Sequence, residues 1–187
     1  MTAKVPEALV LLSGGIDSAA CVAFLQRQGN SVSAIFVDYG QAAADKERDA
    51  AASISDYYRI HLSQIRCEGA SPKLDGFIQG RNAFLIFLAL TQLPFESRIL
   101  SLGAHSGTSY WDCSSQFAKL VQSMLDGYTG GLVRLSLPFL DWNKREIWDY
   151  CNENGVPVGL SYSCELGEEQ PCGKCSSCRD LEVLHAL

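Results

Sequence analysis

Residues 8–20 constrain the fold and the chemistry of this chain more than any other segment. Five apolar residues at 8–12 lead into the sequence S-G-G-I-D-S at 13–18, and a helical pattern follows. Because glycine has no Cβ, Gly14 and Gly15 permit a backbone in which consecutive N–H groups turn toward one anion. The N-terminus of the next helix adds partial positive charge at the same place. The segment therefore predicts a strand, a phosphate-binding loop and a helix, with a nucleotide polyphosphate as the ligand.

This loop differs from the common P-loop, because the pattern G-x-x-x-x-G-K-S/T is absent and no lysine follows the glycines. Transfer of the γ-phosphate is therefore disfavoured. The string S-G-G-x-D-S resembles the PP-loop of the ATP pyrophosphatase (adenine nucleotide alpha-hydrolase-like) superfamily. That resemblance implies cleavage of ATP between its α and β phosphates and adenylated intermediates. The alternative interpretation is an ordinary glycine turn.

Length and composition favour one main domain with a small appended module. The chain has 187 residues, of which 47% are hydrophobic, and this is ample for a buried core. The formal net charge of -6 argues against a surface that holds long nucleic acids. We find no signal-peptide pattern and no apolar run long enough for a membrane span, so we expect a soluble, cytoplasmic protein.

Strand-like and helix-like segments alternate along the chain. This order predicts an α/β fold, a parallel sheet of about five strands with helices on both faces, whose site lies beyond the carboxyl ends of the strands. The apolar segment 82–93 is expected to be buried between layers. The expected strands are 8–12, 31–37, 59–65, 98–104 and 132–137, and the expected helices are 18–28, 41–59, 82–93, 114–125 and 143–153.

A cysteine-rich tail follows residue 160. Cys164, Cys172, Cys175 and Cys178 have the spacing C-x7-C-x2-C-x2-C, which is typical of a closed tetrahedral Zn²⁺ site with a structural role. An iron–sulfur cluster and a redox-active pair are the alternatives, although Arg179 stands where a cluster motif favours proline. We therefore predict an ATP-binding domain at 1–160 and a zinc-binding module at 161–187 packed on it.

The other four cysteines are scattered along the chain. Cys21, Cys67 and Cys151 are expected to be small core residues. The role of Cys113, which follows Asp112, is left open.

Further short strings occur in order along nearly the whole chain. The chain reads D-Y-G-Q at 38–41, G-R-N at 80–82, D-C at 112–113 and K-R-E-I at 144–147, with Pro138 between the last two. Together with the loop and the four cysteines, they resemble the QueC family, the 7-cyano-7-deazaguanine synthases of the queuosine pathway.

The resemblance implies an ATP-dependent conversion of 7-carboxy-7-deazaguanine to the nitrile. Adenylation of the carboxylate releases pyrophosphate, ammonia displaces AMP to give the amide, and a second activation dehydrates the amide. ATP, Mg²⁺ and a structural Zn²⁺ are the implied cofactors. The implied partners are the deazaguanine acid and ammonia, with a homodimer as the assembly, no stable nucleic-acid binding and no membrane.

The resemblance also implies the site residues. Asp17, Ser18, Arg81, Lys144 and Asp112 are the catalytic candidates, with Arg81 and Lys144 as cations on the phosphates. The expected nucleotide-binding residues are Leu12, Ser13, Gly14, Gly15, Asp17, Ser18, Phe36, Val37, Asp38 and Gly103.

Plainer interpretations of single residues stay open. Asp17 either holds Mg²⁺ or caps its helix, since aspartate is favoured at that position. Arg81 and Lys144 are ordinary surface charges in the alternative, and Asp112 is a turn residue. His105 follows a strand that ends near the site, where it either moves protons or is structural.

Two stretches depart from the family pattern. Alanines at 42–44 stand where the family commonly has an Arg-His pair, and residues 105–114 replace its usual D-x-S-G-Y-P-D-C-R. The loop at 67–79 is also short. These changes leave open an enzyme that stops at the amide, or that transfers the acyl group to an acceptor protein in an anti-phage or nucleic-acid-modification system. A catalytically silent nucleotide-binding subunit is the alternative of another class.

Overall fold

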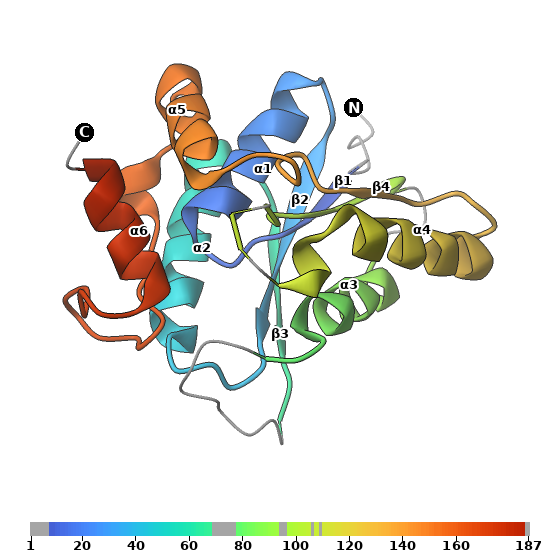
Figure 1. The fold of residues 1–187 in the computed structure, drawn as a ribbon. Coiled ribbons are helices and arrows are strands. Elements are labelled where there is room, and N and C mark those ends of the chain that lie inside the picture. Colours follow the sequence, from blue (N-terminus) through green and yellow to red (C-terminus); the bar gives the residue numbers. More distant parts are fainter. Residues whose placement is uncertain (1–7, 69–77, 94–96, 106, 109, 186–187) are drawn as a thin grey trace.

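The computed structural model describes residues 8–68, 78–93, 97–105, 107–108 and 110–185. Most of the predicted short loop at 67–79 lies outside the described residues. A parallel five-stranded sheet in the order β3-β2-β1-β4-β5 forms the centre of the molecule (Figure 1). The strands are β1 (Ala8–Leu11), β2 (Val32–Asp38), β3 (Leu62–Arg66), β4 (Ile99–Leu102) and β5 (Arg134–Ser136).

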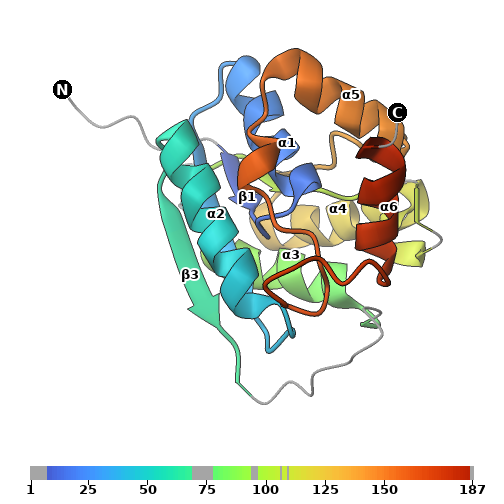
Figure 2. The same cartoon turned by 90° about the vertical axis from the view of Figure 1, so that its left-hand side faces the viewer.

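Helices cover both faces of the sheet, as predicted. The helices are α1 (Ile16–Arg27), α2 (Ala44–Tyr58), α3 (Arg81–Thr91), α4 (Ser115–Thr129), α5 (Lys144–Asn154) and α6 (Ser176–His185), with short 3-10 turns η1 (Trp111–Cys113) and η2 (Val158–Leu160). Because side chains alternate along a strand, Ala8 and Val10 face a core with α1, α2 and α5, whereas Leu9 and Leu11 face a core with α3 and α4. Figures 1 and 2 show these two layers.

Three element boundaries differ from the predictions for local reasons. The helix expected at 41–59 begins only at Ala44, because the Gln41 side chain bonds back to the Tyr39 amide and the Val37 carbonyl in the turn after β2. The strand expected at 59–65 begins at Leu62, because Arg59 ends α2 in a left-handed conformation with φ 54°. The helix expected at 114–125 continues to Thr129, where Gly130 ends it.

One prediction on burial was wrong. The segment 82–93 lies on one face of the sheet and is not enclosed between layers. Asn82, Ile86 and Ala89 are its buried residues, whereas Phe84 is 45% exposed. A nearly continuous apolar run therefore does not distinguish an enclosed helix from one that leaves its outer surface open. Helix α6 was not predicted at all.

The remaining core predictions are confirmed. Cys21 and Cys151 are buried, and Cys67 is half-buried against the second core. Burial raises the pKa of the Cys151 thiol to about 12, which suits an inert core residue. Trp142 and Trp148 pack against the first core. None of the helices in the described ranges is long and apolar enough to cross a lipid bilayer.

Candidate functional site

A cavity of about 550 Å³ opens beyond the carboxyl ends of the strands. The ends of β1, β2 and β4, the start of α1, the first turn of α3 and the C-terminal tail (residues 161–185) line it. This is the position expected for a ligand in a parallel sheet. The predicted nucleotide residues that line it are Leu12, Ser13, Gly15, Asp17, Ser18, Phe36, Val37 and Gly103.

Two glycines allow the phosphate loop to pack against its surroundings. Gly14 has φ +85°, and a Cβ there would lie 2.5 Å from the carbonyl oxygen of Glu47. A Cβ on Gly103 would lie 2.8 Å from the backbone carbon of Asp17, so β4 ends in direct contact with the first turn of α1. Gly14 therefore shapes the loop from behind and does not line the cavity.

The loop presents hydrogen-bond donors to the cavity. Helix α1 begins after Gly15, which has no side-chain cap, and the amides of a first helical turn have no acceptor within the helix. The Ser18 hydroxyl donates to the Gly15 carbonyl at 2.9 Å, and the hydroxyls of Ser13 and Ser18 lie 3.2 Å apart. Amides and hydroxyls at one helix N-terminus suit the oxygens of a polyphosphate.

Asp17 and Lys144 form an ion pair at the head of this loop. Lys144 Nζ lies 2.7 Å from both carboxylate oxygens of Asp17, with side chains 24% and 20% exposed. The sequence positions are 127 residues apart, and the fold brings the starts of α1 and α5 together. Of the two interpretations of Asp17, the structure does not support the helix cap, because Gly15 occupies the cap position and the Asp17 carboxylate faces Lys144.

His105 lies beneath the same pair, with Nε2 3.6 Å from Asp17 Oδ2. Its Nδ1 accepts a hydrogen bond from the Gly107 amide at 3.1 Å, so the neutral ring carries its proton on Nε2 and presents it to Asp17. Burial lowers the pKa of His105, and the nearby Asp17 opposes that shift. The structure therefore places His105 in the site as a neutral ring.

Arg81 lines the cavity away from this pair, in a cluster with Tyr39, Gln41 and Glu47. The Gln41 amide donates to Glu47 at 2.8 Å, and the positive charge of Arg81 lies near both Glu47 and Tyr39. Burial raises the pKa of Glu47, while Gln41 and Arg81 oppose the shift. Sequence reasoning missed Glu47, because it lies in an alanine-rich helix whose charges look solvated.

Besides Gly14, two predicted site residues do not line the cavity. Asp38 accepts a hydrogen bond from the Gly40 amide at 3.0 Å and lies 3.8 Å from Arg66, so its carboxylate shapes the turn after β2. Asp112 accepts from the Asn82 amide at 3.3 Å in the first turn of α3. A carboxylate there stabilises the helix N-terminus that carries Arg81.

The C-terminal tail forms one wall of the cavity. The Tyr162 amide donates to the Gly14 carbonyl at 2.9 Å, which joins the tail to the phosphate loop. A Cβ on Gly167 would collide with the backbone of Ala42, so the tail also contacts the turn before α2. Helix α6 lies beside α5 (Figure 2). The tail residues that line the cavity are Tyr162, Ser163, Glu165, Leu166, Ser176, Ser177, Asp180 and Leu181.

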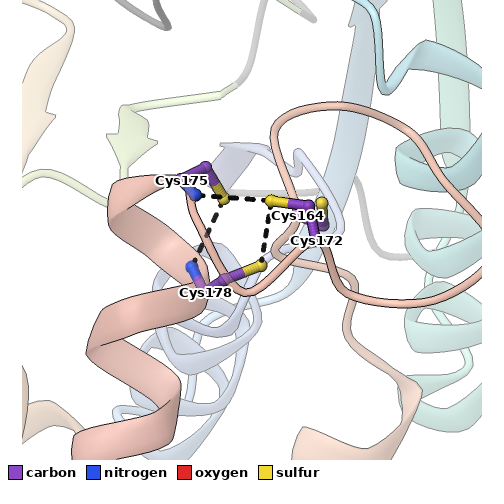
Figure 3. Close-up of side chains that lie close together, drawn as sticks. All are labelled: Cys164, Cys172, Cys175 and Cys178. Carbon is purple, nitrogen blue, oxygen red and sulfur yellow. Dashed lines mark hydrogen bonds between the residues drawn. The ribbon is translucent and has the colours of Figure 1, made fainter.

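The four tail cysteines converge on one point (Figure 3). Their sulfur atoms all lie within 4.8 Å of one another, and Cys164 and Cys178 are buried. Four sulfurs around a tetrahedral zinc lie about 3.8 Å apart, so the donor set fits a single ion. The amides of Cys175 and Lys174 donate to Cys172 and lower the pKa of its thiol, whereas burial raises the pKa of the Cys178 thiol. A metal bound here would displace the protons of these thiols.

The comparison with known families agrees with this geometry. The family model described as "Queuosine biosynthesis protein QueC" matches residues 7–71 and 72–182. The chain belongs to the QueC family. A 7-cyano-7-deazaguanine synthase of Prochlorococcus marinus (strain NATL2A) is 30% identical, over 91% of this chain and 89% of its own length. The 7-cyano-7-deazaguanine synthase 2 of Desulfitobacterium hafniense (strain Y51) is 29% identical, over 92% and 85%.

A solved structure resembles this QueC chain in fold. The U34-tRNA thiolase NcsA from Methanococcus maripaludis with its 4Fe-4S cluster superposes with a TM-score of 0.51. The two are 13% identical, and the match covers 97% of this chain and 65% of that one. At this identity the likeness concerns the fold alone, and it agrees with the predicted α/β fold built on a parallel sheet.

Proposed function

We propose that this protein uses ATP to adenylate the carboxylate of 7-carboxy-7-deazaguanine and condenses it with ammonia, leading to 7-cyano-7-deazaguanine. The observation that carries the proposal is a phosphate loop without a lysine of its own, completed by Lys144 from α5, in a chain of the QueC family. A carboxylate is a poor electrophile with a poor leaving group. Adenylation supplies a leaving group, AMP, that ammonia can displace.

The proposed reaction consists of an adenylation, an amidation and a dehydration. A carboxylate oxygen attacks the α-phosphorus, and the bond to the bridging oxygen breaks to release pyrophosphate. Ammonia then adds to the acyl carbon, loses a proton and expels AMP to leave the amide. The amide oxygen then attacks the α-phosphorus of a second ATP, which releases pyrophosphate and one amide proton. Elimination of AMP with the other amide proton leaves the nitrile. One overall turnover therefore consumes two ATP.

The loop amides and hydroxyls hold the phosphates in this proposal, and Lys144 neutralises the charge that develops on them. Phe36, Val37 and Leu12 border the adenine and ribose. Asp17 lines the cavity with a partly exposed carboxylate, which fits a Mg²⁺ ion that keeps phosphate oxygens and waters as its other ligands. Bound there, Mg²⁺ would offset phosphate charge.

The cysteine cluster holds Zn²⁺ in this proposal, in a module at 161–187 packed on an ATP-binding domain at 1–160. Four thiolate donors leave no open coordination position, so the metal has a structural role. Elemental analysis should find about one zinc per chain. Iron with visible absorption in its place would overturn the assignment.

A second candidate is transfer of the acyl group to a protein amine, or release of the amide. One observation favours it: Ala42, Ala43, Thr108 and Tyr110, from the two stretches that depart from the family pattern, line the cavity. Position 109 and position 106 lie outside the described residues. In this second candidate, the amine acceptor enters beside Ala42, Ala43, Thr108 and Tyr110.

The test is incubation of the protein with ATP, Mg²⁺, 7-carboxy-7-deazaguanine and ammonium, followed by mass spectrometry. AMP, pyrophosphate and nitrile support the first candidate. Amide without nitrile removes the first candidate in favour of the second, as does a mass gain on a partner protein. Binding of ATP without turnover of the acid would instead indicate a catalytically silent nucleotide-binding subunit.

We also propose a homodimer. Helix α4 exposes Leu120, Met124 and Tyr128 at helical spacing, with Leu132 beyond its end, and these side chains are 50–73% exposed. Light scattering should give twice the chain mass. Met124→Lys should shift the protein toward monomer, whereas the neighbouring Ser123→Lys should not.

A further inference from the structure

Glu47 is a cavity-lining carboxylate that the proposed chemistry of the phosphate loop does not use. It lies in the first turn of α2, and Gln41 holds it in place. Gln41 Nε2 donates to Glu47 Oε2 at 2.8 Å and to the Val37 carbonyl at 3.2 Å, while its Oε1 accepts from the Tyr39 amide at 2.9 Å. Because both the nitrogen and the oxygen of the Gln41 side-chain amide are hydrogen-bonded, this amide fixes the orientation of the Glu47 side chain.

The carboxylate of Glu47 has few donors for its degree of burial. Within the part of the chain that the structure describes, only Gln41 donates a hydrogen bond to it, and Arg81 acts on it through longer-range attraction. A carboxylate accepts about four hydrogen bonds, and leaving a half-buried one short of donors costs stability. An arrangement of this kind is stabilised when a ligand brings N–H groups into the cavity.

Glu165, another cavity carboxylate, shows the contrast. Its Oε1 accepts hydrogen bonds from the Ser176 hydroxyl at 2.8 Å, the Ser177 hydroxyl at 2.9 Å and the Ser177 amide at 3.3 Å. The first residues of α6 supply all of these donors, so the Glu165 carboxylate stabilises the start of that helix. Among the residues that the structure describes, Gln41 is the one donor to the Glu47 carboxylate.

We infer that Glu47 recognises the edge of a guanine-like base that carries the ring N1–H and the 2-amino group. This inference rests on the proposed function. The two N–H donors of that edge are parallel, and their spacing matches the two oxygens of a carboxylate. Tyr39 and Phe84 line the same cavity and offer aromatic faces to a planar bicyclic ring. Glu47 is thus a specificity-determining residue, and its fixed position lets it reject acids that lack the 2-amino group.

The experiment compares two acids, 7-carboxy-7-deazaguanine and 7-carboxy-7-deazahypoxanthine, which lacks only the 2-amino group. Acid-dependent exchange of pyrophosphate into ATP is measured for each. We expect the wild-type kcat/KM to favour the guanine-type acid by about 10- to 100-fold, the value of one hydrogen bond to a charged group. Glu47→Gln should bring that ratio to within about 3-fold of unity, with the KM for ATP unchanged.

Asp45→Asn is the matched control, because Asp45 lies in the same helical turn with its side chain 86% exposed. It should keep the wild-type ratio. If Glu47→Gln does not fold, Glu47→Asp keeps the charge but withdraws the oxygens by one methylene, and it should lose the preference as well. The ratio compares two acids on the same protein, so a general loss of stability does not change it.

Each outcome decides between the inference and its competitors. An unchanged ratio in a folded Glu47→Gln protein overturns the inference, as does an unchanged ratio with a raised KM for ammonium, which would assign Glu47 to the amine. Equal losses for both acids with a lowered Tm would assign it a structural role. Absence of exchange in the wild-type protein with either acid would instead overturn the proposed function.

Discussion

The phosphate loop and the C-terminal tail form two walls of one cavity, yet different interactions stabilise them. Strand β1 is buried along its whole length, and eight residues of α1 are buried behind the loop. In the tail, by contrast, the buried side chains are Cys164, Cys178 and Leu184. The first wall is stabilised mainly by apolar burial. The second buries fewer apolar side chains and is held by its four cysteines, by the hydrogen bond to Gly14, by the ion pair of Glu169 with Lys46 and by the packing of α6 beside α5.

This difference implies that a mutation can disrupt one wall of the cavity while the other stays intact. Loss of a charge at the loop should remove chemistry and leave the fold, because the apolar core behind it is untouched. Loss of the metal should release the tail, and with it the residues from 162 to 181 that close the cavity. A protein with this design can lose substrate binding without global unfolding.

The largest effect is expected from Asp17→Ala. It removes the carboxylate that faces Lys144 and His105, and pyrophosphate release should fall by about 10³-fold or more, by analogy with other groups at a reaction centre. The Tm should fall less than on loss of the metal, because the apolar core behind the loop is untouched, although Lys144, 24% exposed, loses its partner. Steady-state pyrophosphate release and a thermal melt measure the two quantities.

Asp45→Ala is the control for that variant. Asp45 and Asp17 are each the second residue of their helix and each pairs with a cation, so both changes remove the same interaction with the helix dipole. Only Asp17→Ala should lose activity. Comparable losses of activity in the two variants, or collapse of the Asp17→Ala fold, would contradict the separation of the two walls.

The second prediction concerns the other wall. Cys175→Ser, or removal of the metal with a chelator, should lower the free energy of unfolding of the tail by several kcal/mol. The same change should raise the Kd for ATP. Limited proteolysis should then cut after residue 160 while the 8–160 portion persists. A cut inside β1 or α1 at the same rate would show that the metal supports the whole fold.

The sequence predicted the first wall better than the second, and the reason is physical. A strand, a glycine loop and an amphipathic helix follow local rules, so the elements around Ser13 and the parallel sheet were predicted correctly. Lys144 was found only through the family resemblance, because its contact with Asp17 spans 127 positions. The bond from Tyr162 to Gly14 joins two backbones and has no side-chain signature. Glu47 was missed because the residues around it, Arg81 at the start of α3 and Glu165 in the tail, are distant in the sequence and come near it only in the folded chain.

A third prediction tests the close contact behind the phosphate loop. Gly103→Ala places a Cβ 2.8 Å from the backbone of Asp17, and this overpacking should destabilise the protein by about 1–3 kcal/mol and weaken ATP binding. Gly127→Ala is the control, because a Cβ there meets nothing within 4 Å inside α4. That change should stabilise by about 0.5–1 kcal/mol. Equal changes in the free energy of unfolding of the two variants, measured by denaturant melts, would contradict the close contact between Gly103 and Asp17.

The smallest effect is expected at Glu47 in α2, which lies outside both walls, and it distinguishes a ligand-binding residue from a stabilising one. The pKa of Glu47 is raised above its usual 4.5, mainly by burial, so above that pH the folded state binds more protons than the unfolded chain. Stability from this group therefore falls as the pH rises from 4.5 toward neutrality. Glu47→Gln should raise the Tm slightly at pH 7, and the gain should vanish near pH 4. Arg81, Asp38 and Glu165 also face Glu47, so the comparison is made at constant ionic strength. A lower Tm for Glu47→Gln at pH 7 would mean that the carboxylate stabilises the fold, and a role in ligand recognition would then no longer be needed to account for its burial.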